Sequence, residues 1–302
     1  MFDISVVGGG PAGMTAALYG LRNGKKVLII EKSAFGGQIT FSPRVENIPG
    51  FPEISGNEFA DHYMDQILGQ GAELEFDEVT GIEDLGEVKV VKTSMGNSFE
   101  GRAVVIATGV KHRMLGLPGE EELVGSGISF CAVCDGDFYT GKKVAVAGGG
   151  NSAFVEAVLL AEKCSEVVML QDLPEFTADE KLQQQLLSHS NVKSFFNTKI
   201  TALNTENGDF RGVEIEDRQT GSRQTVFCDG LFVAIGLIPE NGAFERFCDL
   251  DDRGYFNADE STVTKTAGIF VAGDCRRKNV RQVTTACADG AVAALAACNY
   301  LR

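Results

Sequence analysis

The chain has 302 residues, of which 44% are hydrophobic, and a formal net charge of −15. This length suits one large or two smaller packed α/β domains, and the negative charge argues against nucleic acid and anionic membranes as main partners. Its apolar runs, such as AVAALAAC at 291–298, are too short to span a bilayer, and MFDISVV at the start has no signal-peptide pattern.

The first predicted unit begins with the segment FDISVVGGGPAG at 2–13, a short apolar strand that leads into a G-x-G-x-x-G turn. A helix is expected over 11–23, and the following strand, KKVLIIE, ends in Glu31, 23 residues after Gly8. An acid at that point accepts hydrogen bonds from ribose hydroxyls while the helix N-terminus faces a pyrophosphate. A lone glycine motif is weak, but this context predicts a dinucleotide site.

The next elements are short. The tripeptide GGQ at 36–38 predicts a tight turn, and residues 59–70 predict a helix. Residues 73–107 are expected to form a β-meander of short strands ending in VVIATG, and a loop rich in Gly and Pro follows at 116–127.

A C-x-x-C pair, Cys131 and Cys134, follows this loop. Such a pair can be half a zinc site, a redox disulfide or two core thiols. No second C-x-x-C exists and the three histidines are scattered, so no metal is expected. Asp135 comes directly after the pair, where a helix is expected to begin, and a helix N-terminus stabilises a thiolate. The six other cysteines read as reduced core residues of a cytoplasmic protein.

A second glycine turn lies in KKVAVAGGGNSA at 142–153, a weak repeat of the first, with a helix expected over 151–163. The strand at 167–170 then ends in Gln171, Asp172 and Leu173, with no arginine or lysine nearby. The second turn therefore lacks, in sequence, the cations that would hold a phosphorylated ribose.

The second unit ends in the strand LFVAIG at 231–236, and the final part of the chain contains the strand GIFVAGD at 268–274 and a helix at about 283–300. This part lacks a core of its own and should pack on the first unit. The predicted fold is α/β, with two Rossmann-like, three-layer ββα dinucleotide-binding domains, the second inserted into the first. The expected ranges are 1–114 and 242–302 for the first domain and 115–241 for the second, with a hinge where two linkers cross.

The motifs GGGPAG, GGQ, VENIPGF, ATG, CAVCDGDF, GGGNSA, VAIGLIP and GIFVAGD…RQVTTACADGAVAA occur in the order and spacing of low-molecular-weight thioredoxin reductases, which the whole chain resembles. The resemblance implies FAD as cofactor, with the ADP half on the first glycine turn and Glu31. It places Asn47 near the flavin ring and Asp274 at the ribityl chain. The full set of implied FAD-binding residues is Gly8, Gly10, Pro11, Ala12, Gly13, Glu31, Lys32, Gly37, Gln38, Asn47, Thr108, Gly109, Gly273, Asp274, Arg281, Gln282 and Val283.

The resemblance also assigns roles in CAVC. It implies that Cys134 faces the flavin and that Cys131 attacks the disulfide of thioredoxin, in a homodimeric enzyme. Asp135 would supply the proton that the expelled thiolate needs, if burial raises its pKa. The alternative for Asp135 is that it only caps the helix.

The electron donor is the point at which the chain departs from the family pattern. In NADPH-dependent members His-Arg-Arg and a further Arg clamp the 2′-phosphate, whereas this chain has Gln171, Asp172, Leu173 and Thr177. Each lost charge-assisted contact is worth roughly 1.5–3 kcal/mol, so NADPH is predicted to be a poor donor. NADH stays open because Asp172 could bind a ribose diol. However, Asp172 lies 24 residues after Gly148, whereas Glu31 lies 23 residues after Gly8. This offset of one residue turns the Asp172 side chain to the other face of its strand.

The pattern resembles the ferredoxin-dependent flavin thioredoxin reductases, a pyridine-nucleotide-independent branch. A flavin can collect two single electrons and pass them on as a pair. An acidic ferredoxin would need a basic patch, for which Arg276, Arg277, Lys278 and Arg281 are the first candidates and Lys142–Lys143 the weaker one. The alternatives are a disulfide reductase fed by NADH or another reduced flavin, a dithiol oxidase using O2, and a flavin-binding module without turnover.

Overall fold

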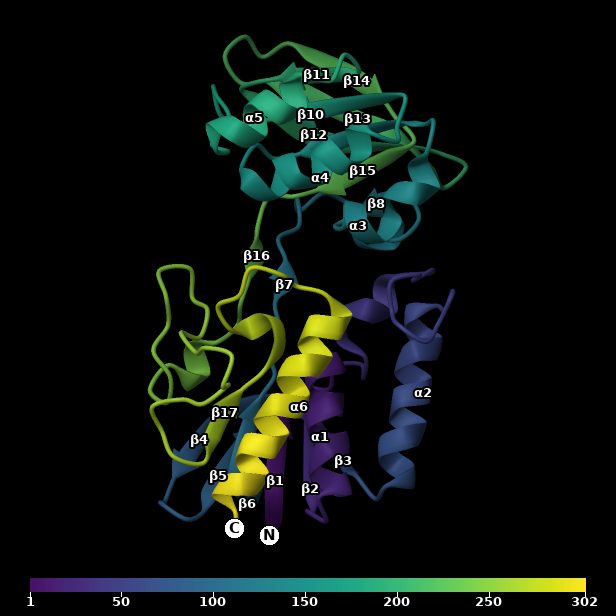
Figure 1. Ribbon diagram of the computed structural model, residues 1–302. Helices are drawn as coiled ribbons and strands as arrows, with labels where there is room; N and C mark the ends of the chain where they lie inside the picture. Colours follow the sequence, from purple (N-terminus) through teal and green to yellow (C-terminus); the bar gives the residue numbers. More distant parts are fainter. The chain divides into compact units, whose positions relative to one another are not determined.

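The computed structural model describes residues 1–302, which divide into two compact units (Figure 1). Unit 1 comprises Met1–Lys111 and Ile238–Arg302, and unit 2 comprises His112–Leu237. The chain passes between them through β7 (Lys111–His112) and β16 (Leu237–Ile238), which pair as a two-stranded sheet. The divisions fall three and four residues before the expected ones at 114/115 and 241/242.

Unit 1 is built on a parallel sheet of order β3-β2-β1-β6, with β17 paired to the other side of β6. Its strands are β1 (Phe2–Val7), β2 (Val27–Glu31), β3 (Glu73–Phe76), β6 (Ser98–Ile106) and β17 (Ile269–Val271). The first half of β6 continues into an antiparallel meander with β4 (Val79–Asp84) and β5 (Lys89–Thr93).

One expectation about these strands is wrong. Residues 73–76 do not belong to the meander but pair in parallel with β2, Leu28 lying opposite Glu73. The reason is that a helix separates the two strands, and a strand that follows a crossover helix returns parallel to the strand before it.

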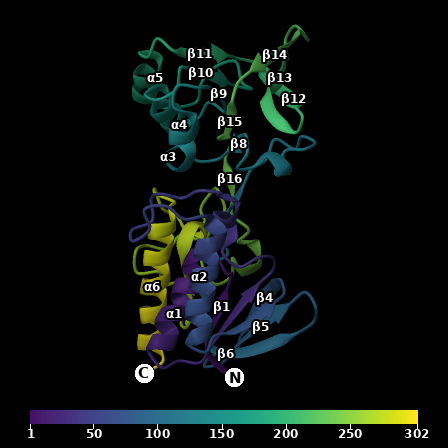
Figure 2. The ribbon, with the colours of Figure 1, turned by 90° about the vertical axis from the view of Figure 1, so that its right-hand side faces the viewer.

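Three helices cover one face of this sheet, and the views from two sides agree that α1 and α6 lie side by side (Figures 1 and 2). They are α1 (Pro11–Arg22), α2 (Gly56–Gly69) and α6 (Val283–Tyr300). Ser55 and Glu58 form a capping box that starts α2 three residues earlier than expected. A Cβ at Gly290 would overlap the Ala12 carbonyl oxygen, so glycine allows α6 to approach α1 closely. No helix is both long and apolar enough to cross a bilayer.

Two cores lie on opposite faces of the sheet because strand side chains alternate. Val6 and Ile29 pack under the helices, whereas Val7 and Ile30 pack against the meander and Phe244. Unit 1 therefore has the expected three layers of helix, parallel sheet and meander.

Unit 2 repeats this plan, with a parallel sheet of order β11-β10-β9-β15-β8 and an antiparallel meander β12-β13-β14. The elements are β8 (Ile128–Ser129), α3 (Ala132–Asp135), β9 (Lys143–Ala147), α4 (Asn151–Ala161), β10 (Glu166–Leu170), α5 (Glu180–Leu187), β11 (Val192–Phe195), β12 (Thr198–Glu206), β13 (Asp209–Asp217), β14 (Arg223–Phe227) and β15 (Gly230–Val233). Short 3₁₀ turns are η1 (Gly37–Phe41), η2 (Glu121–Leu123), η3 (Gly136–Tyr139), η4 (Gly242–Phe244) and η5 (Gly273–Cys275). The fold is thus the predicted pair of Rossmann-like domains, one inserted into the other.

Candidate active site

The first glycine turn joins β1 to α1 at the carboxyl edge of the parallel sheet. Gly8 has φ +107° and a Cβ there would overlap the Ala107 carbonyl oxygen, so only glycine fits. A Cβ at Gly13 would likewise overlap the Gly8 carbonyl oxygen. At Gly10, the N-cap of α1, a Cβ would meet nothing within 4 Å. The open side of the turn is therefore at Gly10, directly before the helix.

Glu31 holds the turn from the end of β2. Its Oε2 accepts from the Gly9 amide at 2.6 Å, and its Oε1 accepts from the Ser33 amide at 2.9 Å. Lys32, which follows it, points its amine at Glu240 (2.8 Å) and Glu78 (3.2 Å). The Lys32 amine is therefore used in ion pairs on the surface of unit 1.

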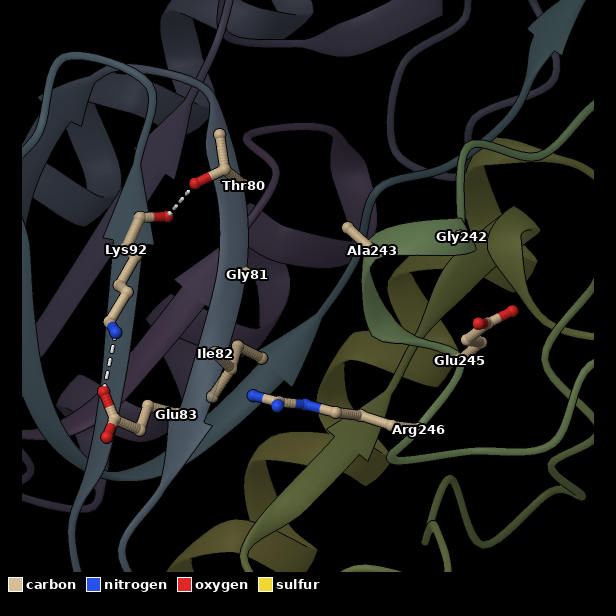
Figure 3. Close-up of a pocket in the computed structure, with 9 residues that line it drawn as sticks. All are labelled: Thr80, Gly81, Ile82, Glu83, Lys92, Gly242, Ala243, Glu245 and Arg246. Carbon is tan, nitrogen blue, oxygen red and sulfur yellow. Dashed lines mark hydrogen bonds and ion pairs between the residues drawn. The ribbon is translucent and has the colours of Figure 1, made fainter.

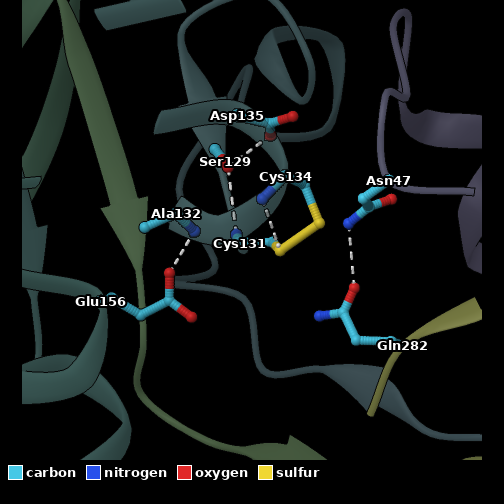
Figure 4. Close-up of a disulfide and its surroundings, with 8 residues drawn as sticks. All are labelled: Asn47, Ser129, Cys131, Ala132, Cys134, Asp135, Glu156 and Gln282. Carbon is cyan, nitrogen blue, oxygen red and sulfur yellow. Dashed lines mark hydrogen bonds between the residues drawn. A yellow bond between two sulfur atoms is a disulfide. The ribbon is translucent and has the colours of Figure 1, made fainter. Parts of the chain in front are cut away.

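The GGQ turn lies against the first glycine turn. Gly37 has φ +62°, and a Cβ on it would lie 3.2 Å from the Gly10 Cα. The Gln38 amide donates to the Val110 carbonyl oxygen. Asn47 reaches the start of α6, where its Nδ2 donates to Gln282 Oε1 at 3.1 Å (Figure 4).

The segment before α6 completes this edge. A Cβ at Gly273 would come within 2.8 Å of the Ala12 Cβ, so the η5 turn packs on the start of α1. Asp274 is half-buried, and its Oδ1 is buried without a hydrogen-bond partner. Burial raises the pKa of this carboxyl to about 6. Arg281 lies over the Tyr255 ring at 4.3 Å, and Val283 begins α6 after the Gln282 N-cap.

Asn241 is a buried residue at this edge that sequence reasoning missed. Its Oδ1 accepts from the Thr108 hydroxyl at 3.1 Å, and its Nδ2 donates to the carbonyl oxygens of Gly254 (2.9 Å) and Cys275 (2.8 Å). It thereby fixes Thr108, just before Gly109 (φ +66°), to the η5 segment. No motif marked it, because its role depends on segments more than 130 residues apart.

The expected basic patch at 276–281 is wrong. The side chains of Arg276 and Lys278 are only 2% and 6% exposed. Both bind Asp289 on α6, at 2.7 and 3.0 Å, and Asp289 also accepts from the Gly273 amide. These cations neutralise a buried carboxylate, so only Arg277 and the half-buried Arg281 remain at the surface. Of the weaker pair, Lys143 is bound to Glu166 at 2.8 Å.

Unit 2 contains the redox pair: Cys131 and Cys134 form a disulfide (Figure 4). Cys131 is the N-cap of the four-residue helix α3, and its Sγ accepts from the Cys134 amide at 3.1 Å. The other six cysteines are unpaired, and five of them are buried. The spacing C-x-x-C thus produces the bond through a single helical turn.

Asp135 lies behind the disulfide. The Ser129 hydroxyl donates to its Oδ2 at 2.6 Å and accepts from the Cys131 amide at 3.1 Å. Its Oδ1 is buried without a partner. Burial raises the pKa of the Asp135 carboxyl, and the Ser129 hydrogen bond opposes that rise. Asp135 does not cap α3, since Cys131 does, so the capping alternative loses its support.

Glu156 on α4 is a second carboxyl here that the sequence did not single out. It accepts from the Ala132 amide at the start of α3 (Figure 4). Burial raises the pKa of this carboxyl to about 7, the hydrogen bond opposes the rise, and the nearby Asp135 adds to it.

The second glycine turn is packed by its own chain in much the same way as the first, where a Cβ at Gly9 would lie 2.5 Å from the Phe35 ring. A Cβ at Gly149 would lie 2.5 Å from the Gln171 side chain, which takes the place that Glu31 has at the first turn. The Gln171 amide donates to the Glu175 carbonyl oxygen at 3.0 Å. The backbone amides of Thr177 and Ala178 donate to the Gly149 carbonyl oxygen at 2.9 and 3.1 Å. Phe176 packs on Phe154 and Phe196, which anchors this segment.

The carboxylate of Asp172 has a partner within unit 2. It forms an ion pair with Arg218, which follows β13, at 2.5 Å. An arginine therefore does lie beside this strand end, although none is near it in the sequence. Sequence distance hid the pair because 46 residues separate its members.

A separate pocket of about 520 Å³ in unit 1 lies between β4 and η4 and contains no predicted site residue (Figure 3). Lys92 and Glu83 on its rim are paired with each other at 2.7 Å. It therefore offers no link to the redox chemistry.

Two Rossmann-like domains with a dinucleotide turn in one and a C-x-x-C disulfide in the other define a flavin-dependent disulfide oxidoreductase. The pyridine nucleotide-disulphide oxidoreductase family matches residues 2–290, and the chain belongs to this family. It is of the thioredoxin reductase type and its cofactor is FAD.

Relatives of known name agree along the full length. A thioredoxin reductase of Bacillus subtilis is 37% identical over 301 residues, covering 100% of this chain and 95% of its own. The crystal structure of thioredoxin reductase from Streptococcus pyogenes superposes with a TM-score of 0.94 at 36% identity, covering 100% of this chain and 98% of the other. Thioredoxin reductase from Giardia duodenalis gives 0.91 at 29% identity, covering 99% and 98%.

Proposed function

We propose that this protein is an FAD-dependent reductase of thioredoxin that takes its electrons from reduced ferredoxin and not from NADPH. The observation that carries the donor assignment is the set of residues at the end of β10, Gln171 and an Asp172 paired with Arg218, where a phosphate-binding turn would present free cations. Gln171 lies over Gly149, and the segment to Ala178 is bonded to the same residue. At this strand end Asp172 brings a negative charge, and Arg218 beside it is already paired with that carboxylate, so neither offers a phosphate the cation that it needs.

The residues of unit 1 fit FAD. A buried carboxylate oxygen without a partner, as on Asp274, needs a hydroxyl donor, and the ribityl chain has several. The open face at Gly10 before α1 suits a pyrophosphate. The residues proposed to hold FAD are those of the sequence prediction, with the backbone of Lys32 in place of its amine. FAD would collect single electrons and deliver pairs to the disulfide.

The disulfide chemistry follows from the local hydrogen bonds. The Cys134 amide points at the Cys131 sulfur and would stabilise a thiolate there, which favours Cys131 as the attacking thiol. Its attack forms a mixed disulfide with thioredoxin and expels one thioredoxin thiolate. Cys134 then attacks the Cys131 sulfur and displaces the remaining thioredoxin sulfur as a thiolate. This step re-forms the Cys131–Cys134 bond, and two electrons have passed to thioredoxin. Asp135 would protonate the expelled thiolate.

Docking of ferredoxin can use only two of the four cations first expected. Arg277 is exposed and Arg281 is half-buried, whereas Arg276 and Lys278 are held by Asp289. With so few free cations, binding would be weak and sensitive to salt, which suits a transient electron-transfer complex. Six unpaired cysteines fit a reducing compartment such as the cytoplasm.

A homodimer is proposed from the family resemblance. The paired helices of unit 1 leave Tyr19, Val292 and Leu295 about 40% exposed, which supports a covered surface there. Sedimentation of the FAD-loaded protein would measure a dimer or a monomer directly.

The donor is tested by anaerobic bleaching of the flavin band with NADPH, NADH or chemically reduced ferredoxin, followed by a count of thioredoxin thiols. Ferredoxin is expected to bleach the flavin and produce two thiols per thioredoxin, with little bleaching by either nucleotide. Cys134→Ser should still bleach but yield no thiols. Rapid bleaching by NADH or NADPH would overturn the donor assignment.

A further inference from the structure

We propose that Glu156 is a positioning residue of the redox disulfide, which holds the first amide of α3 and sets how readily the sulfur of Cys131 carries negative charge. The inference rests on the proposed function, because it concerns the disulfide that would reduce thioredoxin. Glu156 acts through the first amide of α3.

The carboxyl takes up a helix amide that could otherwise stabilise a thiolate. The amide of Ala132, the residue after Cys131, donates to Glu156, and the amide of Cys131 donates to Ser129. Only the Cys134 amide points at the Cys131 sulfur. The amides of Cys131 and Ala132 are thus taken by side chains that contact or carry a carboxyl.

The charge on Glu156 should oppose a thiolate. An ionised carboxylate next to Cys131 repels a second negative charge, and the partly buried surroundings screen this repulsion poorly. Burial raises the pKa of Glu156 to about 7, so its charge changes in the range where the enzyme would work. The restraint on the thiolate should therefore be weak at acidic pH and strong at alkaline pH.

Among the charged groups on α4 and the elements packed against it, we assign the pH-dependent repulsion of the thiolate to Glu156 and Asp135. Asp137 of η3 is paired with Lys163, and Lys143 of β9 is paired with Glu166 of β10. No ion pair joins Glu180 or Lys181 of α5 to Glu156. Asp135 is the one group whose charge acts on the Glu156 pKa.

The redox step balances as follows. Reduction breaks the Cys131–Cys134 bond and adds two electrons, with two protons if both sulfurs become thiols and one if Cys131 stays a thiolate. Where a thiolate forms beside Glu156, the carboxylate takes up a proton from water. Glu156 thus couples proton uptake to reduction.

The test compares Glu156→Gln with the wild-type holoenzyme. Gln keeps an oxygen for the Ala132 amide but has no charge. The disulfide is equilibrated anaerobically against dithiothreitol buffers at pH 5.5 and pH 8.5, and alkylation followed by mass spectrometry reads the two cysteines. At pH 8.5 the variant should favour the reduced form at least about threefold over wild type, which is about 14 mV for two electrons. At pH 5.5 the two proteins should agree.

A second experiment measures the alkylation rate of Cys131 as a function of pH in the Cys134→Ser variant. Glu156→Gln should lower the apparent pKa of that thiol, whereas Glu162→Gln, on the exposed end of the same helix, should not. Glu156→Asp, which keeps the charge, should restore the pH-dependent gap at least partly.

The outcomes separate the inference from the function. Equal potentials at both pH values, or the same gap at both, would overturn the role of Glu156 and leave the disulfide reductase intact. A disulfide that stays oxidised in excess dithiothreitol would overturn the proposed function and the inference with it.

Discussion

Arg218 and Asp172 form an ion pair at 2.5 Å, joining the end of β10 to the β13–β14 hairpin. Both side chains are about half exposed. The pair occupies the one carboxylate that could have read a ribose at the second glycine turn, while Gln171 fills the space over Gly149. Neither residue therefore offers a free carboxylate to a ribose at this turn.

The change Arg218→Gln separates these two contacts. It frees Asp172 but leaves Gln171 in place, so NADH should bleach the flavin no faster than in wild type. The free energy of unfolding should change by less than about 1 kcal/mol, since an exposed pair is screened by water. Stopped-flow bleaching and urea unfolding measure these. A tenfold faster reaction with NADH would mean that the ion pair alone had blocked the ribose.

The two glycine turns offer a matched pair of substitutions, Gly10→Ala and Gly150→Ala. Both residues have extended backbones, and an added Cβ meets nothing within 4 Å at Gly10 and only the Thr177 hydroxyl at 3.6 Å at Gly150. Both apoproteins should fold. Gly10→Ala should weaken FAD binding by tenfold or more, because the methyl group would stand where the pyrophosphate approaches. Gly150→Ala should leave ferredoxin-driven turnover unchanged.

Fluorescence titration of the apoproteins with FAD and steady-state assays distinguish the cases. Unchanged FAD affinity in Gly10→Ala would mean that the pyrophosphate does not bind next to Gly10. Loss of turnover in Gly150→Ala with ferredoxin would mean that the second turn still binds a ligand.

The sequence predicted most of what local pattern determines. The first glycine turn with Glu31, the repeat that marks the inserted domain and the C-x-x-C turn each depend on residues close in sequence. The parallel pairing of β3, the burial of Arg276 and Lys278 against Asp289, and the roles of Asn241, Arg218 and Glu156 were missed. Each depends on a partner that only tertiary packing brings near, so a run of cations looked like a surface although the side chains of Arg276 and Lys278 are buried.

FAD affinity should depend on pH through Asp274. Burial raises the pKa of this carboxyl to about 6 in the protein without FAD, and hydroxyl donors on the cofactor would favour its ionised form. Binding should therefore tighten as pH rises through 6, by about tenfold for each pKa unit that the cofactor restores. The dissociation constant of FAD between pH 5 and 7.5 measures this. Asp274→Asn should bind FAD more weakly at pH 7.5, and its affinity should no longer depend on pH in this range. An equally steep pH dependence in the variant would mean that another group causes it.

Asp135 should act as the acid in thioredoxin reduction, and its substitution is the sharpest test of the site in unit 2. Asp135→Asn should lower kcat by about 10²–10⁴-fold, the range for a lost general acid, while Asp137→Asn, on the neighbouring exposed turn, should not. The raised pKa means that the protonated form is lost as pH rises through it, so wild-type turnover should fall on the alkaline side. Ser129→Ala removes the hydrogen bond that lowers the Asp135 pKa, so this alkaline limb should move to higher pH. A limb that stays in place in Ser129→Ala, with full turnover in Asp135→Asn, would leave Asp135 a structural residue and require another source for the proton.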